Sequence, residues 1–200
     1  MSTSFSINWD YRCPFARNAN EHVITALRSG ERLDVQFMAF SQTQSAVEEG
    51  GTAVWDDPDK RDELLAMAAG IVVRDQFPEQ FYDAHLSLFA MRHDDGEDIR
   101  DEAIVRRALE RVGVDADAVM KELDEGWPFE VLRSEHERSV DEQQVFGVPT
   151  FIAGNEVVFV RLMTRPGDDA ELAKATVEQV LELLVHHPEI NEYKHTTVPF

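Results

Sequence analysis

The sequence contains a single cysteine, Cys13, among its 200 residues. One cysteine excludes an internal disulfide, a two-cysteine redox motif and a zinc site built from a cluster of cysteines. Basic residues are also scarce, with 19 Lys and Arg against 39 Asp and Glu. The resulting net charge of −20 argues against an extended nucleic-acid-binding surface, which needs clustered Lys and Arg, so we expect no nucleic-acid partner.

The chain lacks long apolar runs and nucleotide-binding motifs. Residues 1–5 have neither the basic stretch nor the apolar run of a secretory signal, and no segment approaches about 18 consecutive apolar residues. We therefore expect a cytoplasmic protein with no membrane partner. No glycine-rich phosphate loop is present. The seven histidines offer no metal-ligand spacing, since His186 and His187 are adjacent and diverge on a helix, so no metal is expected.

The residues that are present predict a βαβ unit at the amino terminus. Residues 4–10 alternate between apolar and polar, the period of a strand with one apolar face. Pro14 suits the first position of a helix, and Gly30 suits its end. Residues 33–39 alternate again and predict a second strand, which the helical connection makes parallel to the first.

The middle of the chain is predicted to be helical. From 58 to 145 the apolar residues recur with a period near 3.6. Prolines or acidic residues that favour helix starts recur along this stretch. These starts are Pro58, Pro78, Asp98 or Asp101, Asp115 and a position near Pro128.

The carboxyl-terminal part predicts a hairpin followed by a helix. Residues 150–153 and 156–160 flank Gly154-Asn155, a two-residue turn, and predict antiparallel strands. Asp168 or Asp169 then begins a long helix. The order is βαβ, helical insertion, ββα. We assign 1–55 with 146–200 to one α/β domain and 56–145 to an inserted helical domain.

This order, with Cys-Pro at a helix start and Gly-Val-Pro-Thr-Phe at 147–151 before the hairpin, resembles the DsbA-like family of the thioredoxin fold. The resemblance covers nearly the whole chain. Family members carry a helical domain between the second and third strands and read Cys-Pro-X-Cys at the helix start. Here residues 13–16 read Cys-Pro-Phe-Ala, so Ala16 replaces the resolving cysteine. In the related 2-hydroxychromene-2-carboxylate isomerases and kappa-class glutathione transferases, a serine occupies the place of Cys13.

The resemblance implies roles for several residues. Cys13 is the expected catalytic nucleophile. Pro149 is expected to form a cis peptide bond and to lie beside Cys13, leaving the backbone groups of Val148 available for strand-like pairing with a substrate. The candidate contacts for a thiol or substrate are Pro14, Phe15, Val148, Pro149, Arg12 and Arg161.

The position of Cys13 predicts a reactive thiol. The free N–H groups and positive dipole end of a helix lower a thiol pKa from about 8.5 toward 3.5–7.5. The alternative is an inert buried thiol, the commoner fate of a free cysteine. Arg12 adds a positive charge next to Cys13 in sequence, although it is equally suited to pair with a surface carboxylate.

Other polar residues have two interpretations each. Arg161 and Arg165 suit a carboxylate of a peptide-like thiol, and salt bridges to the acidic surface are the competing reading. His85 lies on an apolar stripe, where a packed and hydrogen-bonded histidine is expected rather than a catalytic base.

Three functions fit these observations. The first is a DsbA-like thiol oxidoreductase in which Cys13 forms a mixed disulfide that an external low-molecular-weight thiol, such as glutathione, resolves. The second is a glutathione-transferase or isomerase-like enzyme in which Cys13 orients a bound thiol. The third is a peptide-binding module without catalysis. The expected partners are a small thiol or disulfide, and the sequence is compatible with a homodimer.

Overall fold

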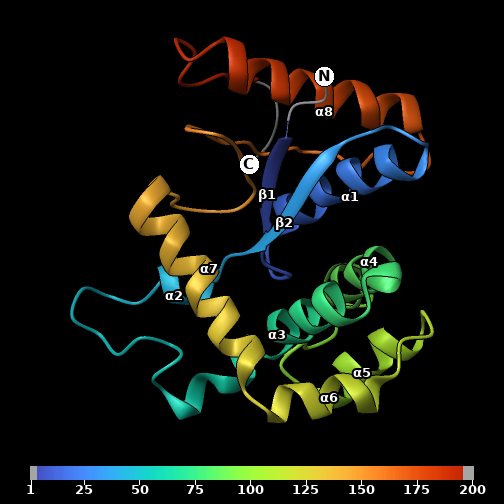
Figure 1. Cartoon of the computed structure of the whole chain (residues 1–200), viewed down its shortest axis with the longest axis vertical. Coiled ribbons are helices and arrows are strands. Elements are labelled where there is room, and N and C mark those ends of the chain that lie inside the picture. The colour runs from blue at the N-terminus through green and yellow to red at the C-terminus, as the bar shows by residue number, and fades with distance from the viewer. Residues whose placement is uncertain (1–3, 196–200) are drawn as a thin grey trace.

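The computed structural model describes residues 4–195 and contains one mixed sheet of four strands (Figure 1). The strands are β1 (Ser4–Trp9), β2 (Asp34–Ala39), β3 (Thr150–Ala153) and β4 (Glu156–Phe159), in the spatial order β2-β1-β3-β4. β1 is parallel to β2 and antiparallel to β3, and β3 is antiparallel to β4. The predicted βαβ unit and hairpin are confirmed.

Two helices cover the sheet. α1 (Pro14–Arg28) and α8 (Ala170–His186) pack against each other, α1 against β1 and α8 against β3 and β4. The remaining helices lie between β2 and β3 in sequence, as expected. They are the short, unpredicted α2 (Gln42–Ser45), then α3 (Arg61–Gln76), α4 (Phe81–His93), α5 (Glu102–Glu110), α6 (Ala116–Asp124) and α7 (Trp127–Gln143).

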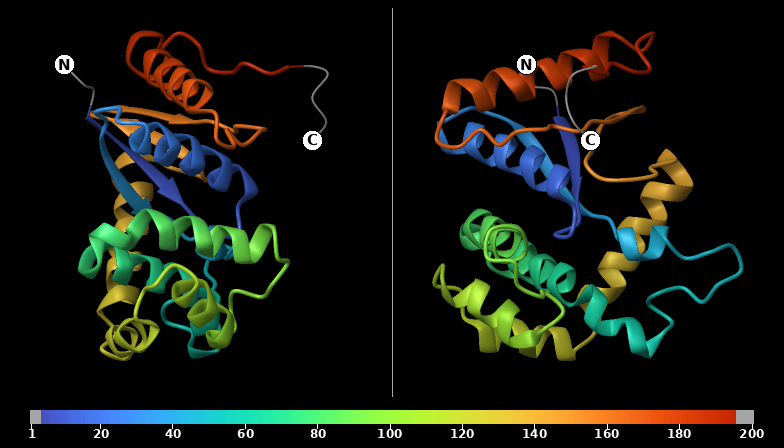
Figure 2. Two further views of the ribbon diagram at one scale, coloured as in Figure 1. Left: turned by 90° about the vertical axis from the view of Figure 1, so that its right-hand side faces the viewer. Right: turned by 180° about the vertical axis from the view of Figure 1, so that it is seen from behind.

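The helical insertion forms a separate layer at one end of the molecule. Figure 2 shows α3 to α6 gathered away from α8, with α7 running from this group toward the sheet. The α/β thioredoxin-like fold with a helical insertion between the second and third strands is therefore confirmed. Within the described residues, no helix is long and apolar enough to span a lipid bilayer.

Aspartates begin three of the helices. The side chains of Asp101, Asp115 and Asp169 accept hydrogen bonds from free backbone N–H groups in the first turns of α5, α6 and α8. Of the alternatives left open by the sequence, Asp101 therefore caps α5 rather than Asp98, and Asp169 caps α8 rather than Asp168.

Two of the prolines predicted to begin helices begin short 3₁₀ turns instead. These turns are Pro58–Lys60 and Pro78–Gln80, and α3 and α4 start directly after them. Proline fits the first turn of a helix because its missing N–H would have no partner there. The start signal was correct, and the regular α-helix begins one turn later.

At the end of β1 and directly after it, polar residues are buried as well as apolar ones. Asn8 and Asp10 are 0% and 3% exposed, although they alternate with Ile7 and Trp9. β1 is an inner strand, and each of the two polar side chains hydrogen-bonds backbone that covers it. Asn8 binds the loop before β3, and Asp10 binds the start of α2. The sequence pattern identified two faces but did not indicate that both are covered.

An ion pair ties the insertion to the free edge of β2. Arg74 of α3 donates to the carbonyl of Phe37 at 2.9 Å, and the Ala39 N–H donates to Glu135 of α7 at 2.6 Å. Arg74 also donates to Glu135 at 3.0 Å. These bonds satisfy edge groups that would otherwise be open to pairing with another strand. They also fix α3 and α7 against the sheet.

A buried histidine links the insertion to the turn after β1. His85 of α4 is fully buried, with Nδ1 at 2.8 Å from the Tyr11 hydroxyl and Nε2 at 3.1 Å from Asn20 Oδ1. Because Asn20 Oδ1 can only accept, Nε2 carries the proton and Nδ1 accepts from Tyr11. Burial, together with the positive charge of Arg74, lowers the pKa of His85 to about 3. The predicted packed histidine is confirmed.

The depressed pKa of His85 makes stability sensitive to acid. Below the ordinary pKa of 6.5 the unfolded chain binds a proton at this residue, whereas the folded chain binds one only near 3. Stability is therefore lost as the pH falls from 6.5 to 3. We expect His85→Gln to reduce the slope of unfolding free energy against pH in this window by up to about 1.4 kcal/mol per pH unit. Urea unfolding at several pH values measures this slope.

The matched control is His186→Gln, at an exposed position of α8. It removes a histidine without touching the contacts of His85 with Tyr11 and Asn20, so the effect of His85→Gln is measured against it. Equal slopes for His85→Gln and the wild type would contradict the assignment of a neutral buried histidine.

Candidate functional site

Cys13 lies between the start of α1 and the loop before β3. It is the N-cap of α1, and its Sγ accepts a hydrogen bond from the Ala16 N–H at 3.4 Å. The thiol donates to the carbonyl oxygen of Val148 at 3.3 Å. The side chain is 4% exposed. The predicted juxtaposition of Cys13 with the Val148–Pro149 loop is therefore present.

The predicted low pKa of Cys13 is wrong in direction. Burial raises the pKa of this thiol above its usual value. The N–H groups of Ala16 and Phe15 and the charge of Arg161 lower it, but their combined effect is smaller. The negative charge of Asp10 raises it further. The helix terminus acts as expected, and loss of water around the sulfur outweighs it.

The Val148–Pro149 peptide bond is cis, and both residues are buried. Gly147 precedes them, and a Cβ atom there would lie 3.3 Å from the Phe159 ring, so the close approach of β4 favours glycine. The resemblance implied free backbone groups at Val148. In this structure its carbonyl is occupied by the Cys13 thiol, and a ligand that pairs with this carbonyl must displace that thiol.

Asn8 holds this loop on β1 and was missed as a site residue. Its Nδ2 donates to the Gly147 carbonyl at 3.1 Å, and its Oδ1 accepts from the Thr150 N–H at 2.6 Å. The two bonds bracket Val148 and Pro149. The available signal was an amide between Ile7 and Trp9, near the end of an otherwise apolar strand. Such a residue needs partners when buried.

Asp10 is the second residue that the sequence interpretation missed. Its carboxylate accepts from the backbone N–H groups of Arg12 and Gln42, each at 2.9 Å. Burial raises the pKa of Asp10, while these two bonds lower it. The Cys13 N–H donates to the Asp10 carbonyl at 3.0 Å. Asp10 therefore shapes the turn that places the thiol.

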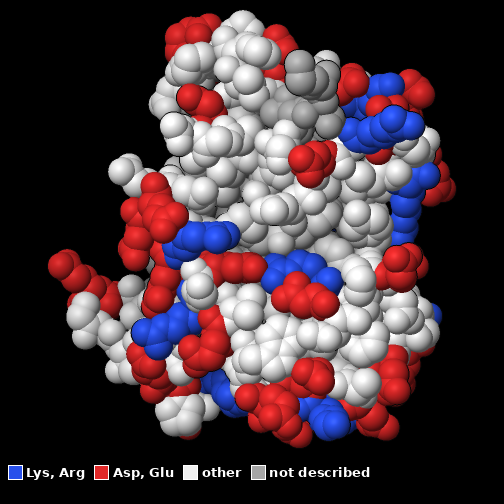
Figure 3. All heavy atoms as spheres, viewed as in Figure 1, with Lys and Arg blue, Asp and Glu red and all other residues white. Residues whose placement is uncertain are grey.

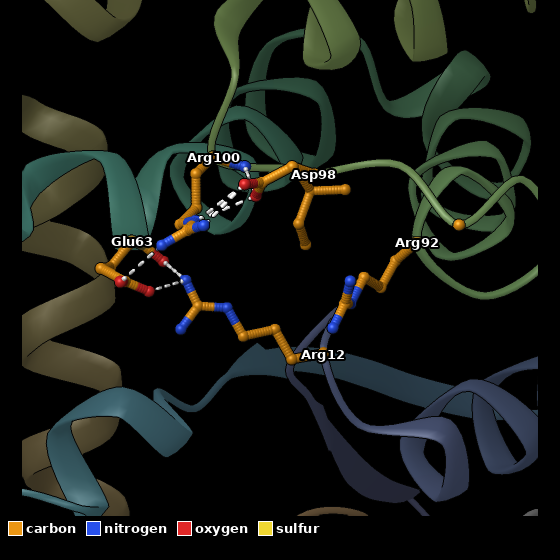
Figure 4. Close-up of a pocket in the computed structure, with 7 residues that line it drawn as sticks. Arg12, Glu63, Arg92, Asp98 and Arg100 are labelled. Atoms are coloured by element: carbon orange, nitrogen blue, oxygen red, sulfur yellow. Dashed lines mark hydrogen bonds and ion pairs between the residues drawn. The ribbon is translucent and has the colours of Figure 1, made fainter.

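Arg12 points away from the thiol. Its guanidinium pairs with the Glu63 carboxylate, donates to the Glu63 carbonyl at 2.7 Å and contacts the Thr43 hydroxyl. Figure 4 shows this side chain directed toward Glu63. The structure therefore favours the alternative reading, in which Arg12 pairs with a carboxylate of the acidic protein.

Arg161 stays near the thiol, whereas Arg165 does not. The Arg161 guanidinium lies 5.5 Å from the centre of the half-buried Phe15 ring and makes no ion pair among residues 4–195. Arg165 instead binds Glu21 at 2.6 Å, as the salt-bridge reading expected. Pro14 is exposed beside Cys13. The surface next to the thiol is thus formed by Pro14, Phe15 and Arg161.

Comparisons with known proteins agree with this architecture. Residues 6–167 match the family profile described as the DSBA-like thioredoxin domain. No curated protein sequence matches the chain.

Several solved structures share the fold at low sequence identity. A 2-hydroxychromene-2-carboxylate isomerase has 18% identity and a TM-score of 0.61, covering 89% of this chain and 96% of that one. A variant of DsbA1 in its oxidised form has 12% identity and a TM-score of 0.61, covering 92% and 84%. The cytosolic disulfide reductase DsbM from Pseudomonas aeruginosa, solved with GSH, has 14% identity and a TM-score of 0.58, covering 90% and 100%.

The raised pKa of Cys13 gives a direct test. We expect the rate of Cys13 alkylation by iodoacetamide to rise with pH along a titration with its midpoint above about 8.5, because burial disfavours the thiolate. Mass spectrometry of protein quenched at timed intervals measures the rate, and Cys13→Ser gives the background. A midpoint below 7 would show that the helix terminus dominates.

The contacts of Asn8 predict a stability loss on truncation. Asn8→Ala leaves the Gly147 carbonyl and the Thr150 N–H without these partners, and we expect the free energy of unfolding to fall by about 1–3 kcal/mol. Urea unfolding measures this change. Ser6→Ala, at a half-buried position on the same face of β1, is the control. A loss no larger than that of Ser6→Ala would mean that Asn8 does not hold the loop.

Proposed function

Since the chain belongs to the family of DSBA-like thioredoxin domains, we propose that it is a thiol-disulfide oxidoreductase working with Cys13 alone. The observation that carries the proposal is the placement of the Cys13 sulfur between the Ala16 N–H and the carbonyl of Val148, whose peptide bond to Pro149 is cis. Ala16 occupies the position where a second thiol would resolve a mixed disulfide.

The proposed reaction has two exchange steps. The Cys13 thiol first loses its proton to a solvent base, and the thiolate attacks a disulfide R–S–S–R′. A new sulfur–sulfur bond forms to R–S, and R′–S⁻ leaves. A free thiolate R″–S⁻ then attacks R–S of the adduct and forms R–S–S–R″. Cys13 departs as thiolate and is reprotonated, so the protein is unchanged after the cycle.

The site supports this role through a change on ligand binding. In the free protein the Cys13 thiol donates a hydrogen bond to the Val148 carbonyl. This bond favours the neutral thiol over the thiolate. A ligand that takes this carbonyl in a strand-like contact removes that bond. The Ala16 N–H remains to stabilise the thiolate.

A small thiol such as glutathione is the proposed co-reactant. Arg161 has no carboxylate partner among residues 4–195, and its guanidinium lies over the Phe15 ring. In sequence, Phe15 directly follows Pro14 and is two residues after Cys13. A guanidinium at this position suits the carboxylate of a peptide-like thiol. We also propose a cytoplasmic location, where such thiols remain reduced.

A second candidate is the isomerase or transferase function, which one observation favours. A buried thiol that donates a hydrogen bond is suited to orient the sulfur of a bound thiol without covalent bonding. The peptide-binding reading has less support, because Val148 and Pro149 are buried.

Oxidised glutathione distinguishes the first two candidates. We expect wild-type protein to gain one glutathionyl group and to keep it until a free thiol is added, because no second cysteine is present. Intact-mass measurement before and after addition of reduced glutathione follows the adduct. Cys13→Ser should remain unmodified.

The matched gain-of-function variant is Ala16→Cys. The introduced thiol restores the spacing of a dithiol motif, so this variant should release glutathione without added thiol and end as an internal disulfide. If wild-type protein binds glutathione in calorimetry yet forms no adduct even at high pH, the exchange mechanism is wrong and the second candidate is favoured.

A further inference from the structure

A polar cavity of about 300 Å³ lies between the turn after β1 and the helical insertion. Four segments contribute to it. Arg12 comes from the turn, Glu63 from α3, Arg92 from α4, and residues 98–100 from the segment before α5. Figure 4 shows Arg12 and Arg100 turned toward Glu63, with Arg92 apart from both carboxylates.

The cavity carries a positive charge in an acidic protein. Three guanidinium groups line it, from Arg12, Arg92 and Arg100, against the two carboxylates of Glu63 and Asp98. The formal charge of the lining is therefore +1, whereas the whole chain carries −20. Figure 3 shows acidic side chains over much of one face of the molecule. A local excess of arginine in such a field indicates a place where an anion is favoured.

Arg92 is not neutralised, because nearby carboxylates are paired with other arginines. It makes no ion pair or side-chain hydrogen bond within residues 4–195. The carboxylates that follow it in sequence bind elsewhere. The pairs are Asp94 with Arg17, Asp95 with Arg111, Glu97 with Arg107 and Asp98 with Arg100. The Arg92 guanidinium therefore lines the cavity without a carboxylate partner among residues 4–195.

The rest of the lining is held in place before any ligand binds. Arg100 donates to both oxygens of Asp98, with Nε at 2.9 Å from Oδ1 and Nη2 at 2.7 Å from Oδ2. Its Nη1 lies 3.4 Å from Glu63. Arg12 is fixed on Glu63 from the other side. A ligand therefore needs to order little beyond Arg92, which keeps the entropic cost of binding low.

We infer that this cavity binds a small monocarboxylate, with its carboxylate on the Arg92 guanidinium. A guanidinium binds a carboxylate through two parallel hydrogen bonds. One negative charge matches the lining, whereas a dianion would also face Glu63 and Asp98. Ile99, an apolar member of the lining, contacts the organic part of the ligand. The site is independent of the thiol chemistry, because no lining residue is part of the exchange steps.

Calorimetric titration with sodium benzoate at constant chloride tests this site. We expect a dissociation constant of about 1 mM or below for the full-length protein. Arg92→Gln should weaken binding at least about tenfold, since it removes a charge-assisted contact. Arg138→Gln, at an exposed position of α7 outside the cavity, should leave the constant unchanged. Cys13→Ser should bind like the wild type, whatever its exchange activity.

Four results would overturn the inference. Equal affinity of Arg92→Gln and the wild type would place benzoate elsewhere. Equal binding of benzamide, the uncharged isostere, would show that charge is not recognised. Tighter binding of inorganic phosphate than of benzoate would reject the monocarboxylate assignment. Loss of binding in Cys13→Ser would move the ligand to the thiol site and equally reject the cavity.

Discussion

The hydrogen bonds of the Asn8 side chain set the geometry on which the site depends. The thiol belongs to a turn at one end of β1, and Val148 belongs to a loop that the chain reaches only after the whole helical insertion. Asn8 binds the backbone on both sides of that loop, at Gly147 and Thr150. Because Asn8 belongs to β1, its hydrogen bonds fix the position of the loop relative to the strand that leads into Cys13. Together with the pairing of β1 and β3, this amide couples two distant segments and supports the 3.3 Å contact between Cys13 Sγ and the Val148 carbonyl oxygen.

The same close packing raises the pKa of the Cys13 thiol and disfavours the thiolate. A helix terminus contributes typically 0.3–1 kcal/mol to a nearby charge, and up to about 2 in favourable geometry. Removing a charge from water costs several kcal/mol in a protein interior. With Cys13 4% exposed and Asp10 nearby, the second effect is larger. Nucleophilic chemistry at this sulfur therefore requires a ligand that replaces the Val148 contact or admits water. In the proposed function, the reactivity of Cys13 is therefore coupled to ligand binding.

The elements of the fold were predictable because their signals are local. Proline, aspartate and glycine mark helix ends through their own backbone and side-chain chemistry, and the structure differs mainly by one turn after Pro58 and Pro78. The roles of Asn8 and Asp10 were missed because alternation assigns a residue to one face of a strand and gives no information on what covers that face. The sign of the Cys13 pKa shift was wrong for a related reason. The N-cap position is visible in sequence, whereas desolvation is a property of the assembled core. The direction of Arg12 likewise depends on Glu63, a partner supplied by the distant α3.

The replacement of a second thiol by Ala16 also determines the side from which a substrate must approach. Ala16 is 0% exposed, so the helical turn beyond the sulfur offers no path to it. On the Val148 side, the loop that Asn8 holds is bonded to the thiol, and a ligand can enter there only by displacing that bond. Exposed Pro14 and half-buried Phe15 leave one accessible side, and the Arg161 guanidinium lies over it. An incoming thiol or disulfide would therefore have to pass this cation to reach Cys13. The positive charge of Arg161 would then attract an anionic group on the substrate at the point of approach.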